Sequence, residues 1–140
     1  MLRSIAAVLV GFVLIAALSF GADAVLRQAM PDMFDASGRV EGTALLLLIM
    51  GYVGLFAVTG CYLTARFAPR RPMLHALVLG ALGLAFNVAG SVAMWDTAPA
   101  WYHAASLALV MPYAWLGGRL REVELERRAA DHPEGIAHPA

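Results

Sequence analysis

The sequence predicts an all-α membrane protein, a four-helix transmembrane bundle with up-down antiparallel helices. Of its 140 residues, 61% are hydrophobic and 14% are charged, whereas a soluble domain carries about 25% charged residues. A helix needs about 20 apolar residues to cross a bilayer. Apolar stretches of this order occupy residues 4–26, 43–66, 73–95 and 101–118. The chain therefore divides into a transmembrane domain, residues 1–120, and a tail, residues 121–140, that we expect to be cytoplasmic and partly disordered.

The arginines alternate across the breaks between these stretches, which predicts the orientation. All ten basic residues are arginine. Only Arg27 and Arg39 fall on one side of the predicted bundle. The other side holds Arg3, Arg66, Arg70, Arg71, Arg119, Arg121, Arg127 and Arg128. Because cytoplasmic loops are enriched in basic residues, both termini are expected in the cytoplasm. Abundant Ala and Gly without lysine is typical of a GC-rich bacterial genome, so we expect the bacterial inner membrane.

The first stretch, residues 4–26, has an alternative interpretation as a signal peptide. Arg3 supplies a positive start, and Ala22-Asp23-Ala24 resembles a cleavage site. A signal peptide has an apolar region of about 7–15 residues, and this stretch is longer. We therefore expect an uncleaved first helix; cleavage would leave a chain beginning at Val25.

The connections predict how the helices follow one another. The first connection, residues 27–42, contains Pro31 and Gly38 and is expected to form a short turn at the membrane surface. The breaks at residues 68–72 and 96–100 are short, so the helices that they join must be antiparallel neighbours. After Gly117 and Gly118 the sequence becomes strongly charged, and Glu124 and Arg128 are spaced to form an i,i+4 ion pair. This predicts a helical extension that either anchors the bundle or docks a partner.

A polar layer is predicted inside the bundle from residues at similar depth. Asn87 is the most deeply placed strong hydrogen-bonding side chain of the stretches, and Tyr52 and Ser19 lie at about the same level. Buried polar side chains in membrane helices form hydrogen bonds between helices. We expect Asn87 to pair with Tyr52, and with Ser19, as a structural clamp; a ligand or ion site is the alternative.

Asp23 is the only acidic residue inside an apolar stretch. Intramembrane acids are functional candidates, as in proton-coupled transport. Asp23 lies near the end of its stretch, however, at about the depth of the headgroups, and Arg27 follows one helical turn later. We therefore expect an interfacial ion pair between Asp23 and Arg27.

No arrangement of residues predicts catalysis, a cofactor or a metal site. His75 and His103 fall near opposite ends of the predicted bundle, and the single cysteine, Cys61, lies within an apolar stretch. We therefore predict a protein without enzymatic activity. Small residues spaced four apart, such as Ala17 and Gly21, favour close helix packing, either within the chain or between copies.

The stretch GCYLTARFAPRRPMLHALVLGALGLA, residues 60–85, resembles small bacterial four-helix integral membrane proteins of uncharacterised function. Leu116-Gly117-Gly118-Arg119-Leu120 is also similar to their endings, whereas Cys61 replaces a usual glycine. The resemblance implies a four-helix membrane fold and names no activity. It also directs attention to a basic hairpin that would contact lipid headgroups or a partner. The hairpin residues are Arg66, Arg70, Arg71 and His75.

The functional expectation is a non-enzymatic accessory or structural subunit of a membrane complex, or a small homo-oligomer. The alternative is a small transporter or channel with a polar path near Asn87. The expected partners are membrane lipids and other membrane protein subunits or further copies of the chain, with no nucleic acid.

Overall fold

The computed structural model describes residues 2–36, 38–40, 42–68 and 70–131. These ranges contain four long helices and two short 3-10 turns, and no β-strand. The elements are α1 (Leu2–Ala29), η1 (Pro31–Met33), α2 (Thr43–Phe67), α3 (Pro72–Ala93), η2 (Trp95–Thr97) and α4 (Ala100–Asp131). The predicted all-α bundle is confirmed at this level.

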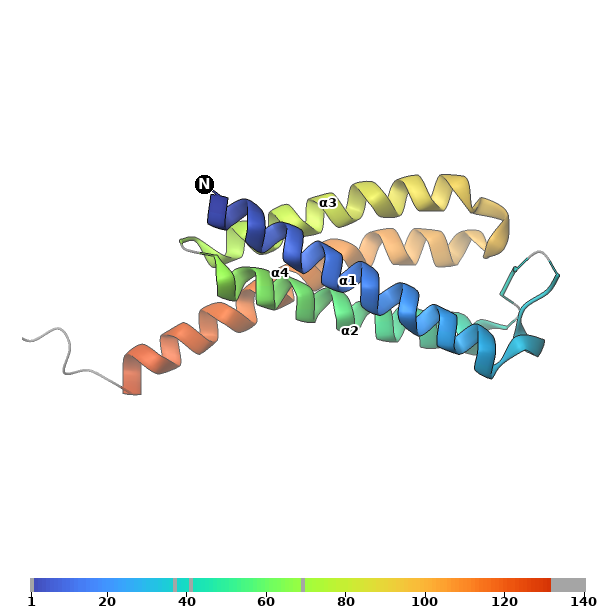
Figure 1. Cartoon of the computed structure of the whole chain (residues 1–140), viewed down its shortest axis with the longest axis horizontal. Coiled ribbons are helices and arrows are strands. Elements are labelled where there is room, and N and C mark those ends of the chain that lie inside the picture. The colour runs from blue at the N-terminus through green and yellow to red at the C-terminus, as the bar shows by residue number, and fades with distance from the viewer. Residues whose placement is uncertain (1, 37, 41, 69, 132–140) are drawn as a thin grey trace, which may run out of the picture.

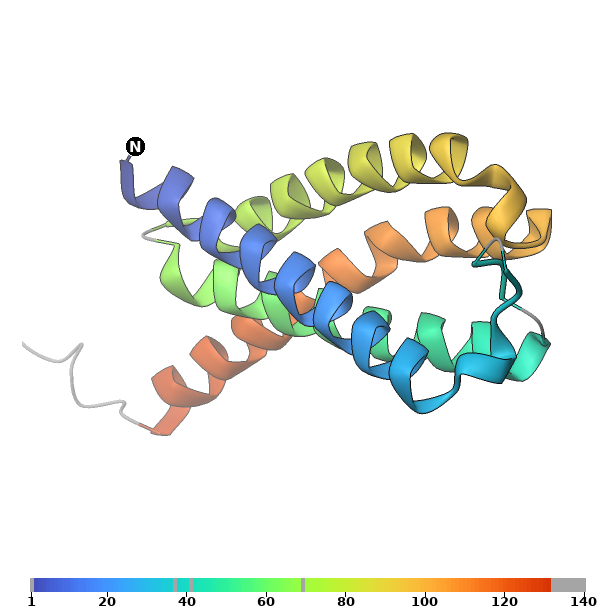
Figure 2. The same cartoon turned by 45° about the vertical axis from the view of Figure 1, so that its right-hand side comes forward.

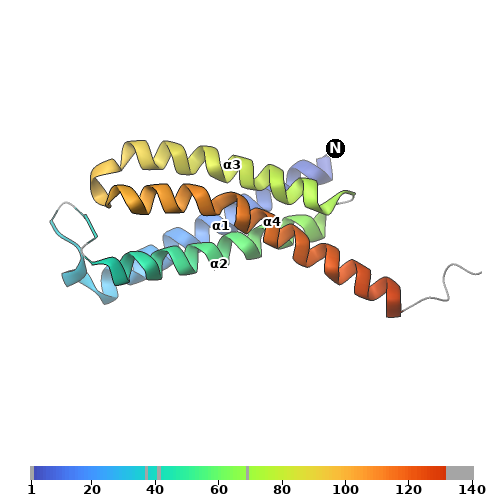
Figure 3. The ribbon, with the colours of Figure 1, turned by 180° about the vertical axis from the view of Figure 1, so that it is seen from behind.

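The helices lie side by side along the long axis of the molecule (Figure 1). α2 contacts each of the other three, while α1 packs on α2 and α3, and α4 packs on α2 and α3. The connections between helices lie at the two opposite ends of the bundle. The loop end holds the α1–α2 and α3–α4 connections, and the arm end holds the α2–α3 turn and residues 119–131 of α4, which we call the arm (Figure 3).

Three of the described helices, α1, α2 and α3, are long and apolar enough to cross a membrane. This is the make-up of a membrane protein. α4 is long enough but less apolar, because its first half includes Tyr102, His103, Pro112 and Tyr113. The predicted fourth crossing therefore does not follow from hydropathy alone.

The helix bounds differ most from the sequence prediction in α4. The apolar stretch ends at Gly118, yet α4 continues without a break to Asp131. Glycine often ends a helix, but Gly117 and Gly118 are buried inside this one. The expected extension is thus the same helix as the fourth apolar stretch. The predicted disorder at the end of the tail concerns residues 132–140, which lie outside the described residues.

Small residues bring the helices close together within the chain. A Cβ added to Gly117 would lie 2.6 Å from the backbone oxygen of Val58, so α4 passes directly against the α2 backbone. A Cβ added to Gly54 would lie 2.6 Å from the Tyr113 ring. Without a hydrophobic driving force between helices in lipid, such contacts carry much of the association.

The core lies around the α2–α3–α4 contact, toward the arm end. Its buried hydrophobic residues are Cys61, Ala65, Ala76, Leu79 and Ala114, with Val8, Phe12 and Ile15 of α1 packed against them. Thr64 is completely buried beside this core and donates a hydrogen bond of 3.2 Å to the Ala7 carbonyl oxygen. This bond joins α2 to α1 without leaving a polar group unsatisfied.

Candidate functional site

The loop end contains a hydrogen bond between the two helices that line its main clefts. Tyr52 of α2 donates its phenolic hydrogen to Oδ1 of Asp23 on α1. Asp23 lies six residues before the end of α1, and Tyr52 is two and a half turns into α2, so the two side chains meet near the same depth. The only acid of the apolar stretches is therefore held by a neutral donor from a neighbouring helix.

The expected Asp23–Arg27 ion pair does not form. Arg27 instead places its guanidinium carbon 4.7 Å from the centre of the Phe34 ring, a cation–π contact with the α1–α2 connection. A Cβ on Gly38 would lie 3.4 Å from Nη1 of Arg27, so this connection closes over the guanidinium. Gly38 has a φ of +80°, which favours glycine at this turn.

Asp23 and Arg27 nevertheless line one cavity of about 160 Å³. Phe34, Gly38 and Val40 of the first connection form one side of it, and Met94, Thr97, Ala98 and Tyr102 form another. The Val40 amide donates to the Thr97 carbonyl oxygen at 3.2 Å, which joins the two connections at this end (Figure 2). The bond holds two walls of the cavity together, and one acid, Asp23, and one base, Arg27, line it.

Aromatic residues surround the same end of the bundle. The Trp95 and His103 rings stack with their centres 5.0 Å apart, and the His103 Nε2 lies 3.2 Å from the Trp95 carbonyl oxygen. Trp101 meets the edge of Tyr102 at 6.1 Å. Trp95 and Trp101 are 54% and 41% exposed. Tryptophan and tyrosine gather at membrane–water interfaces, so this arrangement fits the headgroup level.

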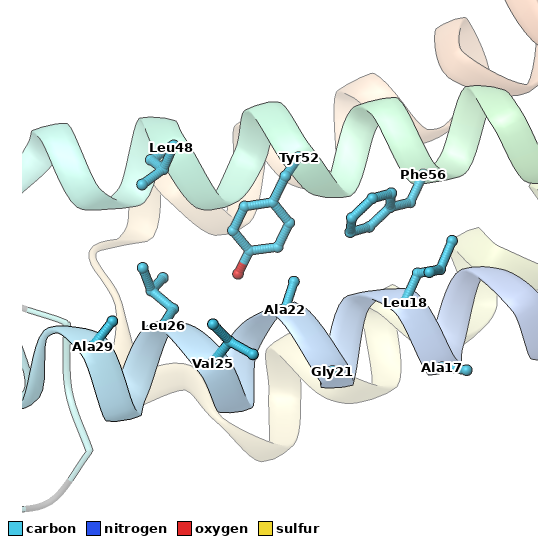
Figure 4. A pocket seen from close by; sticks show the side chains of 10 residues that line it. All are labelled: Ala17, Leu18, Gly21, Ala22, Val25, Leu26, Ala29, Leu48, Tyr52 and Phe56. Atoms are coloured by element: carbon cyan, nitrogen blue, oxygen red, sulfur yellow. The ribbon is translucent and has the colours of Figure 1, made fainter.

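A second cleft is an open apolar groove of about 490 Å³ between α1 and α2. Its α1 side includes Ala17, Gly21, Ala22 and Leu26, and its α2 side consists of Leu48, Tyr52 and Phe56 (Figure 4). The Tyr52 ring reaches from α2 toward α1 within this groove. No atom would lie within 4 Å of a Cβ on Gly21, so this part of α1 faces open space.

The structure does not bring Asn87, Tyr52 and Ser19 together as one layer. Asn87 Oδ1 lies 3.3 Å from Ser91 Oγ and 3.4 Å from Ser106 Oγ, which directs Asn87 toward α4. Tyr52 is bound to Asp23. Ser19 Oγ is buried and has no hydrogen-bond partner among the described residues. Asn87 thus joins α3 to α4, and Tyr52 joins α2 to α1.

The arm end contains a charged cluster centred on Glu124. Its Oε2 accepts hydrogen bonds of 2.7 Å from the Tyr62 hydroxyl and from Arg121, and its Oε1 pairs with Arg128 at 2.7 Å and Arg66 at 3.4 Å. The predicted Glu124–Arg128 pair is confirmed. The Tyr62 hydroxyl, followed by Arg121, lowers the pKa of the Glu124 carboxyl to about 2. Since Tyr62 and Arg66 belong to α2, this one carboxylate fastens the arm to the bundle.

The four residues of the predicted basic hairpin have different surroundings. Arg66 belongs to the Glu124 cluster and also lies 3.1 Å from the Tyr62 hydroxyl. Arg71 begins α3 with a left-handed φ of 52°, and its carbonyl oxygen lies 3.1 Å from His75 Nδ1. Arg70 and Arg71 are exposed. The structure thus separates Arg66, which is engaged with the arm, from Arg70 and Arg71 on the turn and from His75 in the first turn of α3.

Sequence reasoning missed Ser106 and the link from Tyr62 to Glu124. Ser106 is an ordinary small polar residue in an apolar stretch, and only its packing against α3 reveals its role. Tyr62 falls on the same side of the bundle as the arginines, so an interfacial tyrosine beside a charged extension was an available signal. The sequence did not predict which acid Tyr62 contacts, because that depends on the direction of α4.

No protein-family model, curated protein or solved structure matches this chain. The resemblance to small bacterial four-helix membrane proteins therefore stays a prediction. The functional argument rests on the geometry of the two ends of the bundle.

Proposed function

We propose that this chain is a non-enzymatic membrane protein that acts as an accessory or structural subunit, assembled with another membrane protein or with further copies of itself. It resides in the bacterial inner membrane with four crossings and both termini in the cytoplasm. The arm would then stand at the cytoplasmic surface, where it binds the partner.

The fourth crossing is supported by the way α4 lies in the bundle. Its first half runs beside α3 (Figure 3), so a membrane thick enough for α3 also surrounds that half of α4. Its polar side chains point inward: His103 is 6% exposed, and Ser106 contacts Asn87. Polar groups that are satisfied inside a bundle are compatible with a membrane span.

The observation that carries the proposal is the fixed arm. α4 projects beyond α2 and α3 (Figure 3), and the Glu124 cluster holds its direction through Tyr62 and Arg66. Leu120 and Leu125 are exposed on it, at 48% and 41%. A helix that projects from the bundle in a fixed direction, with exposed leucines among charges, offers the apolar anchors and polar rim that partner surfaces use.

The alternative, transport along a polar path near Asn87, has less support. Neither of the two clefts described above is lined by Asn87. The Asn87 amide oxygen lies 3.3 Å from the Ser91 hydroxyl and 3.4 Å from the Ser106 hydroxyl. A clamp between α3 and α4 accounts for this residue.

The test is the mass of the protein recovered from native membranes in mild detergent, measured by light scattering after correction for detergent. We expect a particle larger than one chain, and we expect Leu125→Arg on the arm to reduce it to one chain. Met30→Arg is the matched control, because Met30 is 43% exposed and lies at the loop end. Recovery of the unaltered protein only as a single chain would overturn the proposal.

A further inference from the structure

We propose that the loop end binds a phospholipid with a primary ammonium and a phosphate in its headgroup, such as phosphatidylethanolamine. The headgroup occupies the cavity that contains Asp23 and Arg27, and an acyl chain lies in the groove between α1 and α2. This site is separate from the arm and does not depend on the function proposed for it.

The charges of the cavity match the two charges of this headgroup. Asp23 and Arg27 both line it without forming an ion pair. Tyr52 occupies Oδ1 of Asp23, and no hydrogen bond to Oδ2 is present among the described residues. A primary ammonium has three N–H donors for such an oxygen, whereas the quaternary ammonium of choline has none. The acid thus selects ethanolamine over choline.

Arg27 supplies the phosphate-binding group. Its guanidinium carbon lies 4.7 Å from the centre of the Phe34 ring, a contact that uses none of its N–H donors for a conventional hydrogen bond. A planar guanidinium binds phosphate oxygens with two parallel hydrogen bonds. A headgroup with a phosphate and no ammonium, such as phosphatidylglycerol, would satisfy Arg27 and leave Asp23 without a cation.

Size and depth fit a headgroup. A cavity of about 160 Å³ has room for several water-sized groups, which suits a small polar group rather than a whole lipid. Trp95, Trp101 and Tyr102 surround this end, and such residues mark the headgroup level. The Val40–Thr97 hydrogen bond and the Arg27–Phe34 contact fix two walls of the cavity before any ligand enters.

The groove between α1 and α2 provides the apolar surface against which an acyl chain can lie. Leu26 lines both the cavity and the groove, and Tyr52 lines the groove while its hydroxyl binds Asp23 (Figure 4). From Asp23 toward the middle of the bundle, the groove follows α1 back to Ala17, a rise of about 9 Å. One leaflet contributes about 15 Å of hydrocarbon. The part of an acyl chain nearest a headgroup at Asp23 and Arg27 can therefore lie in the groove, and the rest of the chain extends beyond Ala17 into the leaflet.

The experiment is native mass spectrometry of the full chain, released from nanodiscs that contain equal amounts of phosphatidylethanolamine, phosphatidylglycerol and phosphatidylcholine. We expect phosphatidylethanolamine to be retained about tenfold over either competitor, since one charge-assisted hydrogen bond is worth about that factor. Arg27→Gln and Asp23→Asn should abolish the preference. Arg39→Gln is the matched control, because Arg39 is exposed on the same connection and does not line the cavity.

Gly21→Leu tests the groove separately from the headgroup cavity. The space beside Gly21 is open, so the bundle should accept leucine, and circular dichroism should show unchanged helicity. We expect this variant to lose bound lipid. Equal retention of all three lipids, or full retention by Gly21→Leu, would overturn the proposal. So would equally tight binding of soluble glycerophosphoethanolamine, which would assign the cavity to a free zwitterion.

Discussion

Tyr52 of α2 and Asp23 of α1 are joined by a hydrogen bond at the end of the bundle opposite the arm. At this end the two helices leave an open groove between them, and the bond connects them there. It also fixes the carboxylate at the edge of the cavity that contains Arg27. The Tyr52–Asp23 pair is therefore the structural centre of the loop end.

Removal of the Tyr52 hydroxyl should weaken the bundle slightly. Tyr52→Phe deletes the donor and keeps the ring, so we expect a loss of about 0.6 kcal/mol and no more than about 1.7 kcal/mol, the range for hydrogen bonds between membrane helices. The measurement is unfolding by titration of dodecyl maltoside micelles with dodecyl sulfate. Tyr113→Phe is the control, because its hydroxyl makes no hydrogen bond among the described residues. An equal loss in both variants would contradict the role of the bond.

A methyl group at Gly117 should separate α4 from α2. The added Cβ would meet the Val58 carbonyl oxygen at 2.6 Å, and backbone atoms cannot move aside as a flexible side chain can. We expect Gly117→Ala to destabilise the bundle by about 1–3 kcal/mol, as overpacking typically does. Gly90→Ala, with no atom within 4 Å of its Cβ, should be neutral in the same titration. Equal stability of the two variants would show that α4 does not pass so closely.

Attachment of the arm to α2 should weaken at low pH, over a range that the pKa of Glu124 defines. The pKa of Glu124 is about 2, below its ordinary value of 4.5. A lowered folded pKa means that the ionised carboxylate stabilises attachment fully above about pH 4.5, and that this contribution is lost as the pH falls to about 2. Spin labels on Arg70→Cys and Ala130→Cys, with Cys61→Ser, should give one sharp distance from pH 8 to pH 5 that broadens below pH 4.5.

Glu124→Gln should broaden that distance distribution at every pH, because a neutral amide cannot form ion pairs with Arg66, Arg121 and Arg128. Glu126→Gln is the control, since Glu126 pairs with Arg119 of the arm and, among the described residues, forms no ion pair with α2. A transition near neutral pH would assign the attachment to another group.

Sequence patterns located the helices along the chain, but they did not determine how each helix is rotated about its own axis in the bundle. Hydropathy located α1, α2 and α3 to within a few residues, because burial in lipid requires about the same length of apolar helix each time. Depth counting placed Tyr52 and Asn87 at the same level, but Tyr52 faces α1 and Asn87 faces α4. Depth does not determine the direction in which a side chain leaves its helix, so the polar layer was paired wrongly.

Tertiary contacts that the sequence does not reveal also explain why α4 continues into the arm and why Arg27 does not pair with Asp23. The fourth apolar stretch ends at Gly118, and only the close approach of Val58 to Gly117 shows why glycine occurs inside the continuous α4. Asp23 and Arg27 have the spacing of an i,i+4 ion pair, but Phe34 from the folded connection competes for the guanidinium. In both cases a tertiary contact overrides a local pattern.

The position of the arm relative to the Asp23 cavity tests the proposed topology most directly, because four crossings would place the two on opposite membrane surfaces. In a Cys61→Ser background, Asp32→Cys reports on the loop end and Ala130→Cys on the arm; both positions are exposed. We predict that a membrane-impermeant maleimide labels Asp32→Cys in intact cells, freed of any outer membrane, and labels Ala130→Cys only after permeabilisation. Labelling of both positions in intact cells would contradict the fourth crossing and the cytoplasmic arm.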